Sequence, residues 1–160
     1  MTVFEGPALS QIKVEHLCDF EIEFEPLQVM ASPSVGTRLT VVIKHGVARG
    51  PLLNGEFVPG GGDWITLGAD GVARLDVRAT LRADDGELIY LTNTGRSVGD
   101  ADSSGRFMAG ELLTGADHYV RSSPLFETSS EKYGWLNGAV TTAVNDVAMD
   151  RVHYRVYWVK

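Results

Sequence analysis

Hydrophobic and polar residues alternate with a period of two along much of the chain. In CDFEIEFEP (18–26), Cys18, Phe20, Ile22 and Phe24 fall on one face, and acidic residues fall on the other. Because successive side chains of a strand point to opposite faces, this segment predicts a strand with one solvated face. The segment RVHYRVYWV (151–159) shows the same alternation at the end of the chain.

A predicted hairpin, VARLDVRATLRADDGELIYLTNTG (72–95), is the clearest local unit. Two alternating segments flank ADDG, a turn whose glycine tolerates a positive φ. A four-residue loop would place Arg78 opposite Leu91. A three-residue loop with a glycine bulge would place Arg78 opposite Thr92. A slip of one residue exchanges the two faces, so the sequence leaves open which face lines the protein interior.

In the bulged register, five polar or aromatic residues of this hairpin share one face. That face is either solvated or lines a cavity around a ligand. The five residues are Asp76, Arg78, Thr80, Tyr90 and Thr92.

Eight to ten such strand candidates follow one another at short spacing, separated by short polar turns. No window keeps the apolar spacing of a helix behind a capping residue. Lysine and proline, which protect open sheet edges, are sparse within the strands, and closure removes such edges. The pattern therefore predicts one all-β domain over residues 1–160. We expect a closed or nearly closed antiparallel β-barrel of about eight to ten strands with little helix.

Three segments are less regular. SVGDADSSG (97–105) is the most loop-like stretch and is predicted to be a surface loop. GELLTGADHYV (110–120) is the nearest candidate for a helix, although glycines bracket it. YGWLNGAVTTAV (133–144) is predicted to be a strand with a glycine kink.

Composition and charge exclude several classes of partner. The 160 residues carry a net charge of −7, whereas nucleic-acid binding requires a basic surface. The same charge disfavours an anionic membrane surface. Cys18 is the single cysteine, so no internal disulfide can form. The segment MTVFEGPALS (1–10) lacks the features of a signal peptide, and no apolar run reaches membrane-spanning length. We expect a cytoplasmic protein.

The familiar cofactor and nucleophile motifs are absent. No glycine-rich phosphate loop and no GxSxG elbow occurs. The four histidines stand far apart, and none has a metal-binding neighbour at i+2 or i+4. The sequence therefore predicts neither a metal site nor a cofactor.

An aspartate and a tryptophan follow the glycine run in VPGGGDW (58–64). Glycines allow sharp bends and close backbone approach. We interpret the run as a corner at the barrel rim, with Asp63 facing inward and Trp64 forming a wall. The alternative is structural, because an aspartate after glycines most often holds a turn by bonding nearby backbone amides.

Five motifs resemble those of a known family. They are GGDW (61–64), DVR (76–78), DDGELIY (84–90), YVRSSPLFET (119–128) and YGWLN (133–137). With these spacings, most of the chain resembles the bacterial and fungal family catalogued as domain of unknown function 3237, or uncharacterised protein family 0311. The resemblance implies a β-barrel that assembles into a homo-oligomer and implies no particular activity. Gly62 departs from the family, which commonly carries alanine there.

Charged and aromatic residues in these motifs are the candidate site residues. Arginine suits a carboxylate, tyrosine can stabilise an oxyanion, and tryptophan can stack on a ring. A carboxyl in an apolar barrel has its pKa raised by desolvation and becomes a proton shuttle. The predicted catalytic residues are Asp63, Tyr90 and Glu127, and the predicted substrate-binding residues are Trp64, Arg78, Tyr119, Arg121, Trp135 and Asn137.

These residues predict an acid/base enzyme of the isomerase, hydratase, dehydratase or cyclase type. Its substrate would be a small carbonyl or carboxylate compound. A non-catalytic carrier or sensor of a small ligand is the alternative. A third possibility is a structural oligomer with tryptophans at the subunit interface.

Overall fold

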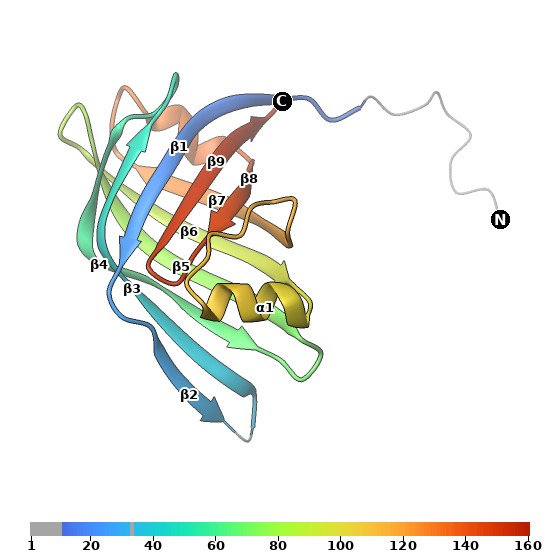
Figure 1. The fold of residues 1–160 in the computed structure, drawn as a ribbon. Helices are drawn as coiled ribbons and strands as arrows, with labels where there is room; N and C mark the ends of the chain where they lie inside the picture. Colours follow the sequence, from blue (N-terminus) through green and yellow to red (C-terminus); the bar gives the residue numbers. More distant parts are fainter. Residues whose placement is uncertain (1–10, 33) are drawn as a thin grey trace.

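The computed structural model describes residues 11–32 and 34–160, which form nine strands and two short helices (Figure 1). The segment that argues against a signal peptide, residues 1–10, lies outside the described residues. The strands are β1 (Val14–Phe24), β2 (Gln28–Ser32), β3 (Gly36–Arg49), β4 (Gly55–Leu67), β5 (Val72–Ala83), β6 (Leu88–Val98), β7 (Tyr119–Thr128), β8 (Thr141–Val147) and β9 (Arg151–Val159). The helices are α1 (Ala101–Met108) and the 3-10 helix η1 (Gly134–Gly138).

Eight of the strands close into an antiparallel barrel. The hydrogen-bonded order is β1-β9-β8-β7-β6-β5-β4-β3-β2, and a further pairing of β1 with β3 closes the ring. That pairing runs from Asp19 opposite Arg49 to Phe24 opposite Ile43. β2 pairs with β3 alone and extends the sheet beyond the barrel (Figure 1). The predicted closed antiparallel barrel with little helix is confirmed.

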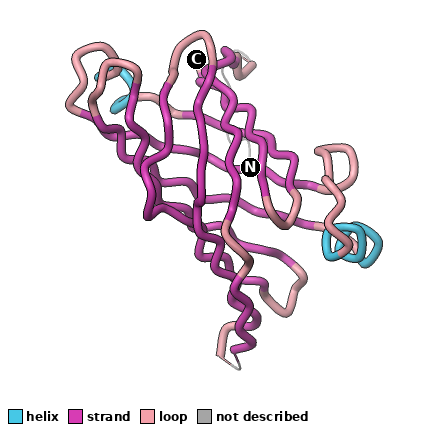
Figure 2. Tube along the Cα trace, turned by 60° about the vertical axis from the view of Figure 1, so that its left-hand side comes forward, coloured by secondary structure: helices cyan, strands magenta, loops and turns pink. Residues whose placement is uncertain are grey.

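The barrel interior is filled at one end and hollow at the other. The filled end is formed by the first halves of β1, β4, β6 and β8 and by the last halves of β3, β5, β7 and β9. Side chains such as Phe20, Leu81 and Phe126 pack there. Phe20 meets Phe57 edge to face at a centroid distance of 5.2 Å. Figure 2 shows α1 and η1 at opposite ends of the barrel.

The hairpin between β5 and β6 adopts the bulged register. Arg78 lies opposite Thr92 and Thr80 lies opposite Tyr90. Val77, Ala79 and Leu81 are buried, whereas Arg78 and Tyr90 are exposed. The shared polar face is therefore solvated, and the apolar face of the hairpin lines the barrel interior.

A capped helix replaces the predicted loop at 97–105. β6 continues to Val98, and α1 begins at Ala101. The Asp100 carboxylate accepts a hydrogen bond from the Ser103 amide at 2.8 Å, and the Asp100 amide donates to the Ser103 hydroxyl at 2.9 Å. This reciprocal pair satisfies two amides at the helix start. The sequence signal for this helix start was an aspartate, Asp100, followed three residues later by a serine, Ser103.

The other irregular segments also differ from the predictions. Residues 110–118 form turns with one isolated bridge, between Leu113 and Val147, rather than a helix, and β7 begins at Tyr119. The YGWLN segment forms η1 rather than a strand, and β8 begins only at Thr141. Leu136 in η1 is fully buried in the core at the filled end, so η1 is anchored to the barrel by this side chain. Neither described helix has the length and hydrophobicity needed to cross a bilayer.

Replacing Asp100 with alanine is expected to loosen α1, because the Ser103 amide loses its acceptor at the helix start. We expect amide protection within α1 to fall by roughly fivefold in hydrogen exchange, while the barrel strands keep theirs. Asp102→Ala is the matched control, since Asp102 lies in the first turn but is not the capping residue. Equal loss in both variants would contradict the capping role.

Candidate functional site

A cavity of about 460 Å³ occupies the end of the barrel nearest α1. Its lining comes from both halves of the closed sheet and from α1 itself. The wall is mostly aliphatic and aromatic and includes Ile22, Leu39, Val41, Leu75, Phe107 and Val152. Volumes of this size hold small organic ligands.

Besides the hydroxyls of Thr37, Ser97, Ser103 and Ser104, four polar side chains interrupt this wall: Asp63, His118, Asn145 and Tyr154. They come from β4, the loop before β7, β8 and β9. Asn145 and Tyr154 are direct cross-strand partners. Among the described residues, no lysine or arginine lines the cavity. Within the same residues, no three His, Cys, Asp or Glu side chains gather closely enough to hold a metal ion.

Asp63 lies on the inward face of β4, in the same alternating series as Gly55 and Phe57, and a bulge separates it from them. The register of β4 against β5 shifts between Val58 and Gly62, and Gly60 adopts a φ of 106°. A Cβ atom at Gly62 would lie 2.5 Å from the Val41 carbonyl oxygen, so the strands approach closely there. The glycine run is therefore a bulge within one continuous strand, and the predicted corner at the barrel rim is wrong.

The Asp63 carboxyl is held in one orientation and is poorly hydrated. Its Oδ1 accepts a hydrogen bond from the Asp76 amide at 2.9 Å. Burial is the main cause that raises the pKa of Asp63 to about 7. The hydrogen bond from the Asp76 amide lowers this pKa, and the negative charge of the Asp76 side chain raises it further. A carboxyl with this pKa both accepts and releases a proton near neutral pH.

Tyr154 provides a buried phenol in the same cavity. Burial raises its pKa, the Asp63 charge raises it further, and Asn93 opposes the shift. The phenol is therefore protonated at neutral pH and available as a hydrogen-bond donor. Its ring packs against Phe20 at a centroid distance of 5.8 Å, which places Tyr154 between the filled end and the cavity.

Two cavity-lining groups lack hydrogen-bond partners among the described residues. They are Oδ1 of Asn145 and Nδ1 of His118. Burial lowers the pKa of His118, against smaller opposing contributions from Thr114, Asp117 and Asp146. Because buried polar atoms are usually paired, these two atoms are exceptions in the packing of the cavity wall.

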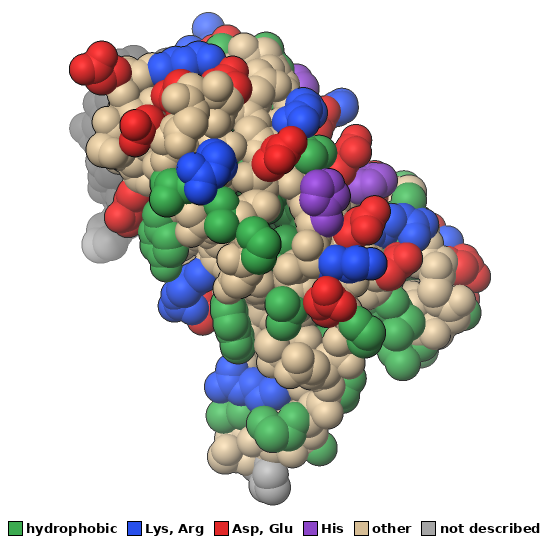
Figure 3. Space-filling model, turned by 90° about the vertical axis from the view of Figure 1, so that its left-hand side faces the viewer, with side chains coloured by type: hydrophobic (Ala, Val, Ile, Leu, Met, Phe, Trp, Pro, Cys, Tyr) green, Lys and Arg blue, Asp and Glu red, His purple; other side chains and the backbone are tan. Residues whose placement is uncertain are grey.

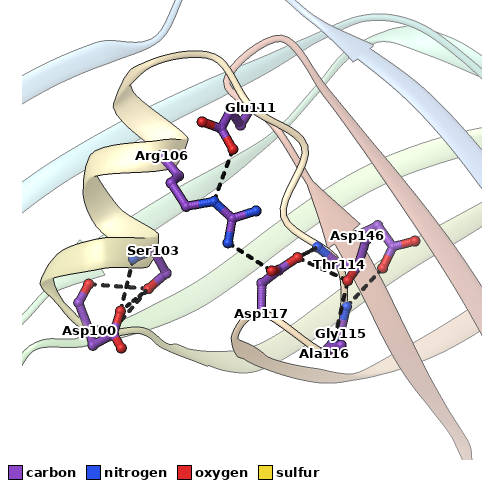
Figure 4. Close-up of polar contacts among 9 residues, drawn as sticks. All are labelled: Asp100, Ser103, Arg106, Glu111, Thr114, Gly115, Ala116, Asp117 and Asp146. Atoms are coloured by element: carbon purple, nitrogen blue, oxygen red, sulfur yellow. Dashed lines mark hydrogen bonds and ion pairs between the residues drawn. The ribbon is translucent and has the colours of Figure 1, made fainter.

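Ionic and polar contacts hold α1 over this end of the barrel (Figure 4). Arg106 donates to Glu111 at 2.9 Å and to Asp117 at 2.8 Å. The Gly115 amide donates to Asp146 of β8 at 3.0 Å, which ties the loop after α1 to the barrel. Phe107 and Met108 of α1 complete the cavity wall.

Most of the other predicted site residues lie outside the cavity. Tyr90, Trp64, Tyr119 and Trp135 are exposed aromatic residues. Glu127 is exposed as well. On the face drawn in Figure 3, charged and hydrophobic side chains are interspersed.

The predicted anchors also have local partners. Arg78 pairs with Asp76 at 3.1 Å on the solvated face. Arg121 donates to the Val120 carbonyl and lies over the Tyr119 ring at 5.1 Å. Asn137 exchanges two hydrogen bonds with the Thr128 backbone, where it holds the turn after β7. Of the nine predicted site residues, Asp63 is the one that lines the cavity in the described structure.

Sequence reasoning missed Asn145, His118 and Tyr154 as site residues. Two of them carried a signal. Asn145 interrupts the inward series of TTAVNDV, between Ala143 and Val147. Tyr154 occupies an inward position of RVHYRVYWV, although an inward tyrosine is by itself compatible with core packing.

The fold and the site define a closed β-barrel with a largely apolar cavity and one partly buried carboxyl of raised pKa. Residues 12–159 match the family described as "Protein of unknown function (DUF3237)". The chain therefore belongs to this family, and the resemblance seen in the sequence motifs is confirmed.

Three similar proteins illustrate the range of this family. A UPF0311 protein of Clostridium acetobutylicum is 35% identical over 70% of this chain and 71% of its own. A crystal structure of a beta-barrel like protein from Acinetobacter baumannii is 30% identical, with a TM-score of 0.80 over 97% of this chain and all of that one. The hydroalkoxylation enzyme phnH of Penicillium herquei is 31% identical over 71% of this chain and 60% of its own length.

The pH dependence of unfolding should reveal the Asp63 carboxyl. Because its pKa is raised in the folded state, its contribution to stability is full below roughly pH 4 and is lost as the pH rises through about 7. The unfolding free energy of the protein relative to Asp63→Asn should therefore fall by about 3 kcal/mol across this range. Urea unfolding at several pH values measures this difference. A difference that stays constant with pH would contradict the raised pKa.

Proposed function

We propose that the protein is an enzyme that transfers a proton to and from an uncharged, largely apolar small molecule bound in the barrel cavity. Asp63 is the acid/base residue. The observation that carries the proposal is a carboxyl with a pKa of about 7 in the wall of a largely apolar cavity. A general acid or base works best when its pKa is close to the working pH.

The composition of the cavity wall favours an uncharged substrate. A carboxylate substrate would need a cation, and the described lining contains no lysine or arginine. The arginines expected to anchor it, Arg78 and Arg121, bind partners outside the cavity. An anion would also be repelled by ionised Asp63. A neutral ketone, enol, alcohol or phenol needs no cation in the cavity wall and is not repelled by the Asp63 charge.

The chemistry of this set is proton transfer without a covalent intermediate. Ionised Asp63 removes a proton from an O–H or from a carbon next to a carbonyl, and the resulting carboxylic acid returns it at another atom. Tyr154 donates a hydrogen bond to the substrate oxygen on which charge develops. This scheme covers isomerisation, hydration, dehydration and cyclisation.

One relative supports the cyclisation and hydration branch. Hydroalkoxylation adds an O–H across a carbon–carbon double bond, and the relative phnH carries that activity in its name. The reaction breaks the O–H bond, forms a C–O bond and delivers a proton to the other alkene carbon. A single carboxyl with a pKa near 7 can take up and deliver that proton in turn, so the electrons and atoms balance without an oxidant.

Deuterium exchange of 2-tetralone tests the proposed chemistry without knowledge of the natural substrate. This neutral apolar ketone has acidic protons next to its carbonyl. In D2O the protein should exchange them with saturable kinetics, and the rate should rise with an apparent pKa near 7 as Asp63 ionises. Asp63→Asn should reduce the exchange by at least about 100-fold, measured by NMR.

Asp76→Asn is the matched control. Asp76 lies beside Asp63 on the neighbouring strand, but its side chain pairs with Arg78 on the solvated face. The variant should keep the exchange, with its pH midpoint moved downward because the Asp76 charge helps to raise the pKa of Asp63. Saturable exchange that survives Asp63→Asn would rule out the catalytic assignment. Binding of 2-tetralone with no exchange at any pH would favour a carrier instead.

A further inference from the structure

Asn145 is a buried polar residue that the proton transfer by Asp63 does not use. It is 3% exposed, lies on β8 and lines the cavity. Its Oδ1 has no hydrogen-bond partner in the described part of the chain. A buried amide without a partner destabilises the folded protein, whereas a leucine of similar size would not. The position is therefore poorly explained by packing alone.

The neighbours of Asn145 define a small polar corner in the cavity. Tyr154 is its direct cross-strand partner on β9, and both side chains point inward. The Cβ atoms of directly opposed residues on neighbouring strands lie about 5 Å apart, so both side chains border the same part of the cavity. The Asn93 side chain of β6 also bonds the Tyr154 phenol. The Asp63 carboxylate is near enough to raise the pKa of the Tyr154 phenol, so the corner adjoins the proposed acid/base.

We infer that Asn145 and Tyr154 form a subsite that binds a hydroxyl oxygen of the substrate. This inference rests on the proposed function and narrows its substrate class to uncharged hydrophobic alcohols, phenols or enols. The substrate hydroxyl donates a hydrogen bond to Oδ1 of Asn145 and accepts a hydrogen bond from the Tyr154 phenol. A hydroxyl satisfies both groups because it is a donor and an acceptor at one atom.

Other oxygen groups satisfy the corner less well. A ketone or an ether accepts from Tyr154 but offers no proton to Oδ1 of Asn145. A carboxylate likewise offers no proton, and its charge is disfavoured beside Asp63. The subsite therefore selects for the hydroxyl group rather than for oxygen in general.

Binding of matched aromatic probes tests this selectivity. The probes are 2-naphthol, naphthalene and 2-methoxynaphthalene, which share one ring system and differ in the hydroxyl. At pH 7 the protein should bind 2-naphthol about 3- to 10-fold more tightly than the other two, the range expected for one net hydrogen bond. Quenching of tryptophan fluorescence or calorimetry measures the three affinities.

Asn145→Leu should abolish the preference for 2-naphthol over 2-methoxynaphthalene, because both probes can still accept from Tyr154, and should leave the affinity for naphthalene unchanged. Ser122→Ala is the matched control, because its Oγ is also buried and unpaired but does not line the cavity. That variant should keep the preference. A preference that persists in Asn145→Leu would overturn the inference.

Thermal unfolding separates recognition from a structural role. Because Asn145→Leu removes an unpaired buried amide, the variant should melt a few degrees higher than the parent protein. A marked fall in the melting temperature would indicate a structural role instead. Tyr154→Phe provides a second test, since it keeps the ring and removes the donor, and it should weaken the 2-naphthol preference.

Asp63→Asn distinguishes this inference from the proposed function. The variant should lose the 2-tetralone exchange but keep the 2-naphthol preference. If the parent protein shows no exchange while Asn145→Leu still loses the preference, the subsite stands and the proposed catalysis fails. If exchange is observed and the preference is absent, the catalysis stands and the subsite fails.

Discussion

The antiparallel pairing of β1 with β3 is the constraint on which the rest of the structure depends. It closes eight strands into a ring and separates the interior from water. Aromatic and aliphatic side chains fill one end of that interior, and the other end remains a cavity under α1. Without closure, the inward residues of β4, β8 and β9 would face solvent on separate parts of an open sheet.

Closure also determines the chemistry. A carboxyl placed in this interior loses most of its hydration, and one backbone amide only partly compensates for that loss. The same interior leaves the Asn145 amide unpaired. Both features reduce stability in the empty protein, and both are suited to a ligand with an exchangeable proton. Stability and site chemistry are therefore opposed at these positions.

The sequence was most informative where local pattern and burial agree. Alternation in CDFEIEFEP predicted the buried face of β1, and the density of strands predicted closure. The inward position of Asp63 was also expected, although the bulge that precedes it within β4 was not. Arg78 and Tyr90 lie outside the cavity because the bulged hairpin register places them on the solvated face. The sequence allowed two registers for this hairpin and did not decide which face would point inward. Asn145 and Tyr154 escaped notice because their meeting with Asp63 depends on closure, which joins strands far apart in the chain.

The most direct test of this account is the titration of Asp63 itself, followed through its carboxyl carbon by NMR. The spectrum of Asp63→Asn, which lacks the resonance, assigns it. The account predicts a midpoint near pH 7 in the protein without ligand. A midpoint near pH 4, as in a solvated aspartate, would show that the cavity is wet and that Asp63 is not a proton shuttle.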